Sequence, residues 1–149
     1  AYEIYPPKLK EPYRTSRFEL GEQMYELLGI GREDKEARIA QVMENFKFFG
    51  APCAFFCFID RQMGPPQWSD LGMFIQSIML LARENGLHTA PQEAWAIWHK
   101  TISNFLEIPD DLMLFCGMGI GYADPENSIN SFRSEREEVD SFTQFIGFK

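Results

Sequence analysis

One stretch of the sequence could place backbone hydrogen-bond donors against a ligand. Leu87 to Thr89 has the pattern of a short extended piece, Pro91 follows, and a helical pattern begins at Glu93. The first turn of a helix leaves backbone N–H groups without intrahelical partners, and such groups can donate to the ring edge of a cofactor or to an anion. The alternative is an ordinary strand-to-helix connection with proline near the first helical position. Taken alone, the stretch is compatible with both.

A glycine-rich run also invites a ligand-binding interpretation. It reads GMGIG at residues 117–121 and follows an apolar segment. A dinucleotide-binding turn is excluded because the spacing differs from GxGxxG and because the following residues, YADP at 122–125, cannot open the helix that the motif requires. We expect the glycines to let a neighbouring backbone or a ligand approach a strand closely.

The cysteines and histidines indicate neither a disulfide nor a metal site. Cys53, Cys57 and Cys116 lie in apolar runs, and an odd number without CxxC spacing or a secretory leader indicates a reducing, cytoplasmic setting. Cys53 and Cys57 share a face of a predicted strand but lie roughly 13 Å apart, too far for a disulfide. We expect all three to be buried small hydrophobes. Neither His88 nor His99 has Cys, Asp or Glu neighbours at metal-ligand spacing.

A long central helix is predicted over residues 71–85, with Ser69 as its N-cap and Gly86 as its stop. Apolar side chains cover nearly its whole circumference, which is typical of a helix buried in a core or in a subunit interface. Gln76 and Ser77 interrupt the apolar run. The uninterrupted pieces are therefore far shorter than the about 20 residues that a membrane span requires.

The remaining elements follow from apolar patterns and from breaks in them. Helices are predicted over 18–28, with Ser16 as N-cap, over 32–48 and over 93–106. The runs 53–59 and 112–116 are continuously apolar and predict strands buried on both faces. Residues 1–17 are proline-rich and predict an extended surface segment, and Gly64-Pro65-Pro66 should break the chain before the central helix. Helices around a small sheet give an α+β or α/β fold, and 149 residues favour a single domain.

Composition and charge narrow the possible partners. A hydrophobic content of 45% with 14 Phe favours a large packed core. The net charge of −8 argues against nucleic acid, since neutralising phosphates requires clustered Lys and Arg. A small molecule or another protein is the expected partner. The last residues include Phe142, Phe145, Ile146 and Phe148, and we expect so aromatic a run to dock on this subunit or on another one.

Four separated motifs occur together in one order. They are GPPQWSD at 64–70, GLHTAPQEAW at 86–95, GMGIGYADP at 117–125 and INSFRSER at 129–136. In this combination the sequence resembles the FMN-dependent nitroreductase family, and most closely its nitroaromatic-reducing branch. The resemblance covers nearly the whole chain, although no single motif would suffice.

The resemblance implies both a fold and an activity. The fold would be α+β, with three layers of helix, sheet and helix, a small mixed sheet, and the long central helices packed across the two-fold axis of a homodimer. The activity would be a flavin-dependent oxidoreductase that reduces nitroaromatic or quinone compounds with NAD(P)H through FMN bound at the interface. Because the cofactor supplies the chemistry, we expect no catalytic side chain.

The resemblance also assigns cofactor-binding residues. In the family, the loop matched by Ala90, Pro91, Gln92 and Glu93 lies beside the isoalloxazine ring, with backbone N–H groups near the flavin N5 and O4. The basic residues of the family's tail hold the phosphate, and Arg133 and Arg136 match them. A guanidinium group offers a fixed fork of donors suited to phosphate. The alternative is that these arginines are surface residues that balance an acidic tail.

The opening of the chain departs from the family pattern. Family members begin with a basic Arg-Ser segment and a later Ser/Asn-rich stretch that contact FMN, and this sequence matches neither. We therefore expect the family's first helices and at least one strand to be missing and FMN to be held weakly, with less than one per subunit. One alternative is that Lys8, Lys10, Arg14 and Arg17 fold back and supply the absent cations. Another is a non-catalytic remnant or partner subunit of the same fold.

Overall fold

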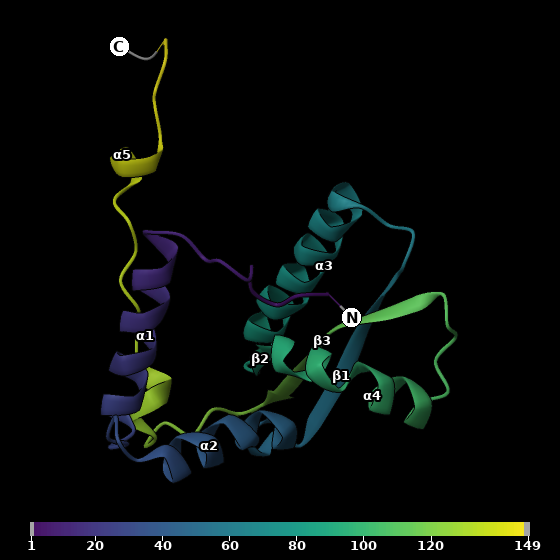
Figure 1. Cartoon of the computed structure of the whole chain (residues 1–149), viewed down its shortest axis with the longest axis horizontal. Helices are drawn as coiled ribbons and strands as arrows, with labels where there is room; N and C mark the ends of the chain where they lie inside the picture. Colours follow the sequence, from purple (N-terminus) through teal and green to yellow (C-terminus); the bar gives the residue numbers. More distant parts are fainter. Residues whose placement is uncertain (1, 148–149) are drawn as a thin grey trace.

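The computed structural model describes residues 2–147 and has a three-stranded sheet at its centre (Figure 1). The strands are β1 (Cys53–Asp60), β2 (His88–Gln92) and β3 (Leu112–Gly121), in the spatial order β1-β3-β2. The middle strand β3 carries the most deeply buried side chains, which are those of Leu114, Cys116 and Met118. Both strand pairs are antiparallel, so among the described residues the sheet is not the mixed sheet that the resemblance implies.

Helices cover the two faces of this sheet. Ile75 of α3 (Pro65–Glu84) packs with Cys57, Cys116 and Met118. Successive residues of a strand point to opposite faces. Gly117 accordingly faces the other way, toward Trp95 of η2 (Glu93–Trp98), and α4 (His99–Phe105) follows η2. The α+β fold and its three layers are therefore confirmed.

The long helix α3 begins earlier than predicted. Its N-cap is Gly64, whose backbone N–H donates to the Oε1 of Gln67 at 3.2 Å. Proline suits the first helical position because its φ is preset and its missing N–H would be unpaired there anyway, so Pro65 starts the helix and does not break the chain. Ser69 is not the cap; its hydroxyl donates to the carbonyl of Pro65. The predicted stop is confirmed by Gly86, which has a left-handed φ of 74°.

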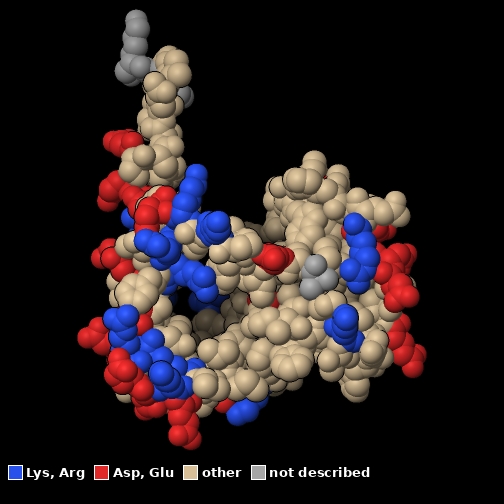
Figure 2. Space-filling view, in the orientation of Figure 1, with Lys and Arg blue, Asp and Glu red and all other residues tan. Residues whose placement is uncertain are grey.

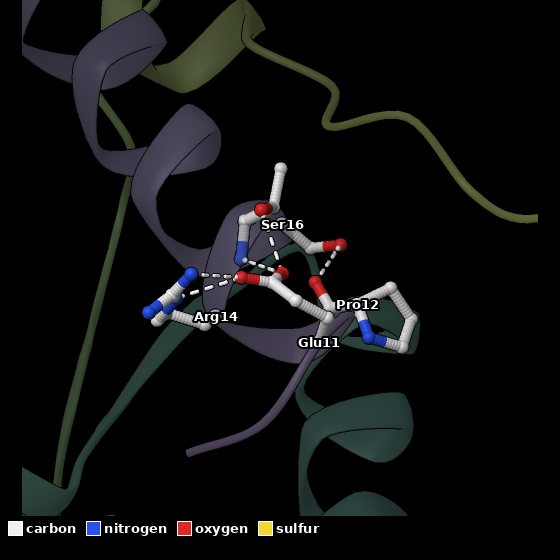
Figure 3. A network of polar contacts seen from close by, with 5 residues as sticks. Glu11, Pro12, Arg14 and Ser16 are labelled. Carbon is white, nitrogen blue, oxygen red and sulfur yellow. Dashed lines mark hydrogen bonds and ion pairs between the residues drawn. The ribbon is translucent and has the colours of Figure 1, made fainter. Parts of the chain in front are cut away.

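The first helix, α1 (Tyr13–Leu27), also begins earlier than predicted, so residues 13–17 are helical and not extended. Ser16 is not its N-cap, because the Ser16 hydroxyl donates back to the carbonyl of Pro12. The carboxylate of Glu11 accepts hydrogen bonds from the backbone N–H and the hydroxyl of Thr15, as well as from Arg14 (Figure 3). A side chain before the predicted cap therefore satisfies a free N–H of the first turn.

The helices α1 and α2 (Lys35–Met43) form an arm beside the sheet (Figure 1). Asp34 caps α2 by accepting from the N–H of Ala37 at 3.0 Å, and the predicted helix continues beyond Met43 as a 3-10 helix, η1 (Glu44–Gly50). Figure 2 shows an open cleft between this arm and the body formed by α3 and the sheet, with Lys and Arg side chains gathered on the arm. The N-terminal segment crosses between them, and the hydroxyl of Tyr2 donates to the carbonyl of Phe115 at 2.7 Å.

The start of β1 corrects the prediction of a strand buried on both faces. Cys57 and Ile59 are buried, but Cys53 and Ala54 are exposed. β1 is an edge strand, and Cys53 lies at its first position, opposite Ile120. Cys53 is therefore not the buried small hydrophobe that the apolar run suggested.

Much of the apolar surface is not covered within the chain. Ile75 is the only buried residue of α3, while its Met73, Phe74, Leu80 and Leu81 are each more than half exposed. The accessible surface is 11463 Å². A compact monomer of 17.3 kDa would expose about 7,800 Å². The chain therefore exposes about 3,600 Å² more than a self-contained globule of its mass.

The tail after β3 passes η3 (Ser128–Ser131), runs along α1 and extends away from the body beyond α5 (Val139–Phe142) (Figure 1). Phe142 and Ile146 are 69% and 77% exposed. Phe142 and Ile146 are thus largely uncovered by their own subunit, which leaves the alternative that the run docks on another subunit as a prediction, and Phe148 lies outside the described residues. Among the described residues, no helix combines the length and the apolar character needed to cross a membrane.

Candidate functional site

The predicted ligand-facing stretch lies at an edge of the sheet. Ala90, Pro91 and Gln92 end β2, and Glu93 begins η2. Pro91 is thus within a strand, opposite Met118, and not in the first helical turn. Proline is tolerated there because an edge strand leaves one side of its backbone without a ladder partner. Among the described residues no strand pairs with the outer side of β2, so backbone groups of this loop can face a ligand.

The glycines of β3 form a notch behind this loop. A Cβ built on Gly117 would lie 2.5 Å from Cδ1 of Trp95 and 3.1 Å from Cε1 of Phe48. A Cβ on Gly119 would lie 3.2 Å from the carbonyl oxygen of Phe48, and one on Gly121 would lie 2.7 Å from Cδ of Pro52. The expectation that these glycines admit a close approach is confirmed, and what approaches is the chain's own η1, the Ala51–Pro52 link that follows it, and η2.

A strained corner occupies the notch. Phe48 and Phe49 have left-handed φ values of 52° and 51°, which cost about 1–2 kcal/mol for each residue with a Cβ. The ring of Phe48 stacks on Trp95, with ring centroids 4.8 Å apart, and Phe46 and Phe56 pack edge-on against the same indole. The aromatic packing offsets the strain and holds η1 against the residues that follow the loop.

Gln92 is the buried polar residue of the site. It is 3% exposed, and its Nε2 donates to the backbone carbonyl of Asn45 in η1 at 2.8 Å. Its Oε1 is buried without a hydrogen-bond partner in the described structure, and so is the Nε1 of Trp95. A buried polar atom left unpaired costs about 1–3 kcal/mol. Stability alone therefore does not account for glutamine at this position.

Arg133 and Arg136 lie on the tail, apart from the loop. Their guanidinium groups are exposed and donate to nearby carbonyls of the tail, and Arg136 also contacts the hydroxyl of Ser134. Figure 1 places the tail beside α1 and β2 within the body. The structure thus brings Ala90, Pro91, Gln92 and Glu93 together but does not bring the two arginines to them within one chain.

Arg136 lines a hollow of about 560 Å³ between α1 and the tail. Arg17 lines the same hollow, so one of the four cations of the N-terminal stretch does lie near the tail. Four carboxylates share the hollow, from Glu19, Glu135, Glu137 and Glu138. Because acidic groups outnumber the two guanidinium groups there, the hollow within a single chain does not fit a phosphate.

The thiols and histidines give no second site. Among residues 2–147, no cluster of three or more His, Cys, Asp or Glu side chains could hold a metal ion. Cys57 and Cys116 lie opposite each other in β1 and β3. Burial raises the pKa of the Cys57 thiol, and burial together with the neighbouring Cys57 raises the pKa of Cys116 to about 12. These thiols are unreactive core residues at neutral pH.

The family to which these features belong is shown by sequence comparison. The model of the nitroreductase family matches residues 6–122, which is most of the chain. The chain belongs to the nitroreductase family. Two curated nitroreductases are similar to the chain over almost its whole length. A 4-nitrobenzoate reductase of Pseudomonas putida is 39% identical over 96% of the chain. A chloronitrobenzene nitroreductase of Comamonas testosteroni is 34% identical over 97% of the chain. The chain spans 63% and 64% of the lengths of these two nitroreductases.

Solved nitroreductase structures have the same fold. The FMN and NADPH-dependent nitroreductase NfnB from sphigopyxis sp. strain HMH is 46% identical and superposes with a TM-score of 0.95 over 99% of this chain and 66% of its own. The FMN-dependent NfnB from Mycobacterium smegmatis, crystallised with NADPH, is 23% identical with a TM-score of 0.91 and supports the fold alone.

Two residues of the site escaped prediction from the sequence. Asn45 contributes through its backbone carbonyl, and Phe48 contributes through a left-handed conformation. Neither property has a residue-type signature. The spacing of Gly117 and Gly119 did signal a close approach, but not which segment approaches.

Proposed function

We propose that this chain is a flavin-dependent nitroreductase that uses NAD(P)H to reduce nitroaromatic or quinone-type compounds. The observation that carries the proposal is the loop from Ala90 to Glu93, which lies at an open sheet edge and is backed by the glycine notch of β3. The loop occurs in a chain similar to curated reductases of 4-nitrobenzoate and chloronitrobenzene. The backbone alone can supply donors there, which fits a cofactor whose ring edge presents acceptors.

We infer that FMN is held at two places. The backbone of Ala90, Pro91, Gln92 and Glu93 would contact the ring edge, and Arg133 and Arg136 would hold the phosphate with charge-assisted hydrogen bonds. When bound, FMN would supply the electron transfer, so the protein contributes binding, orientation and exclusion of water. The loop fits the ring edge because its outer side is unpaired. Arg136 fits the phosphate only if it leaves the carboxylates that share its hollow.

We propose that two copies of the chain pair as a homodimer with the exposed face of α3 at the interface. Two copies together carry an excess of about 7,200 Å², which exceeds the roughly 2,000–5,000 Å² that obligate interfaces bury over both partners, so pairing can cover a large part of this surface. Phe142 and Ile146, which extend from the body, would contact the partner. Sedimentation velocity at micromolar protein is the test, and a well-folded monomer would contradict the pairing.

The activity is tested by colour and turnover. The purified protein should be yellow with flavin absorption, or it should be colourless and gain this absorption with added FMN. It should also oxidise NAD(P)H only when a nitroaromatic acceptor such as 4-nitrobenzoate is present. Both results together support the proposal. A protein that takes up no FMN at saturating concentration would overturn it. That result would favour the alternative of a non-catalytic member of the fold.

A further inference from the structure

The side chain of Gln92 joins two segments that are distant in sequence. Its Nε2 reaches the carbonyl of Asn45 at 2.8 Å and the Oδ1 of Asn45 at 3.4 Å, across 47 positions of the chain. Its backbone lies in β2, opposite Gly117 of β3. The residue is therefore held from two directions, by the sheet through its backbone and by η1 through its amide.

Within the candidate site, the chain turns a second corner at Gln92. Gln92 is the last residue of β2 and the N-cap of η2, so the chain changes direction immediately after it. Glu93, the first residue of η2, is exposed, whereas Gln92 is 3% exposed. Fixing the Gln92 side chain thus fixes the orientation of the next peptide unit.

The acceptor of this hydrogen bond is itself immobilised. The Asn45 side chain donates from Nδ2 to the carbonyl of Val42 at 2.9 Å, and the neighbouring Phe46 and Phe48 pack on Trp95. Trp95 lies just beyond the corner, against Gly117. The hydrogen bond and the aromatic packing therefore hold the two sides of the corner to the same segment, η1.

We propose that Gln92 is a positioning residue for the flavin, whose buried amide sets the orientation of the Gln92–Glu93 peptide toward the ring edge. This rests on the proposed function, since it assumes FMN as the ligand of the loop. Methionine, an apolar side chain of similar volume, would remove the unpaired Oε1 but would also leave the Asn45 carbonyl without its donor, so its two effects on stability oppose each other. Glutamine offers a directional hydrogen bond that methionine lacks.

The test replaces Gln92 by methionine and uses Gln62→Met, at an exposed glutamine in the turn after β1, as the matched control. Hydrogen exchange of the amides at 92–95 is measured first in the flavin-free protein. FMN affinity is then measured by quenching of flavin fluorescence, and the melting temperature of the flavin-free form is recorded. None of the three measurements requires turnover.

We expect Gln92→Met to melt at nearly the same temperature as the unmodified chain, to exchange its 92–95 amides faster, and to bind FMN about tenfold more weakly, the scale of one lost hydrogen bond. Gln62→Met should change none of these. Unchanged exchange would overturn the positioning role, and so would faster exchange with unchanged FMN affinity. A lower melting temperature with unchanged FMN affinity would also overturn it, because it would assign Gln92 a purely structural role. Failure of the unmodified chain to bind FMN would overturn the proposed function itself and is seen before any variant is made.

Discussion

Replacing Gly117 by alanine tests whether the notch in β3 is closed by aromatic rings. The added Cβ would lie 2.5 Å from Cδ1 and 3.0 Å from Nε1 of Trp95, whereas carbon atoms in contact prefer about 3.5–4.0 Å. The indole would have to move by about 1 Å. It has little freedom to do so, because Phe46, Phe48 and Phe56 all pack against it.

The expected cost follows from two opposing effects. Overpacking a filled core costs about 1–3 kcal/mol. Replacing glycine by alanine restricts the unfolded chain and returns about 0.4–1 kcal/mol. The net loss should be about 1–2 kcal/mol, which for a chain of this length lowers the melting temperature by about 2–8 °C.

The assay is thermal unfolding of the flavin-free protein followed by circular dichroism, with Gly21→Ala as the control. Gly21 lies within α1, and a Cβ built there meets no atom within 4 Å. Alanine at that position should raise the stability by roughly 0.5–1 kcal/mol, because glycine is unfavourable inside a helix. If Gly117→Ala melted at or above the temperature of the unmodified chain, the notch would not be closed and the account of the site would be refuted.

Three further outcomes are expected. Arg136→Ala should weaken FMN binding by about 1.5–3 kcal/mol, the scale of a charged hydrogen bond, while leaving the melting temperature of the flavin-free form nearly unchanged. Fluorescence titration measures the FMN affinity, and an affinity equal to that of the unmodified chain would show that this arginine is a surface residue. Of the three thiols only the exposed Cys53 should react rapidly with a thiol reagent at pH 8, because burial raises the pKa of Cys116 to about 12 and also raises the pKa of Cys57. Rapid reaction of more than one thiol per chain would contradict the burial of Cys57 and Cys116. The hydrogen bond from Arg38 lowers the pKa of Glu22, so the pair stabilises the fold above the unfolded pKa of this carboxyl and loses that effect as the pH falls through the lowered pKa. Glu22→Gln should therefore make the melting temperature less sensitive to pH over that acid range. An unchanged pH profile of the melting temperature would show that the pair is not formed in solution.

Local signals in the sequence were sufficient for several elements. Gly29 and Gly86 both adopt left-handed φ values directly after helices that were predicted to stop there. Such features depend on one residue and its immediate neighbours, so they can be read without knowing what packs against them.

Helix starts were predicted less well because the caps were unusual. Gly64 and Pro65 start α3, and Glu11 serves the first turn of α1, whereas Ser69 and Ser16 form hydrogen bonds within their own helices. A serine before an apolar pattern is a frequent cap, but it competes with every other side chain that can reach the same N–H groups.

The burial of apolar runs was decided by tertiary structure alone. The continuous run that begins at Cys53 does not show that its first residues lie at the exposed end of an edge strand. In the same way, the all-round apolar character of α3 predicted burial, yet in the single chain only Ile75 is buried. The apolar residues of a segment indicate how much of its surface is favourable to bury. Which of these residues are buried depends on the neighbouring elements and on partner chains.

The candidate site likewise has features that the sequence predicts and features that only the folded structure shows. The order of residues 86–95 and the glycines of β3 were sufficient to locate the loop and to predict a close approach behind it, because both depend on local backbone requirements. The hydrogen bond from Gln92 to Asn45, and the stacking of Phe48 on Trp95, join residues 47 positions apart in each case. Contacts of that kind are set by the register of β2 against β3 and by the left-handed corner in η1, and so only the folded chain reveals them.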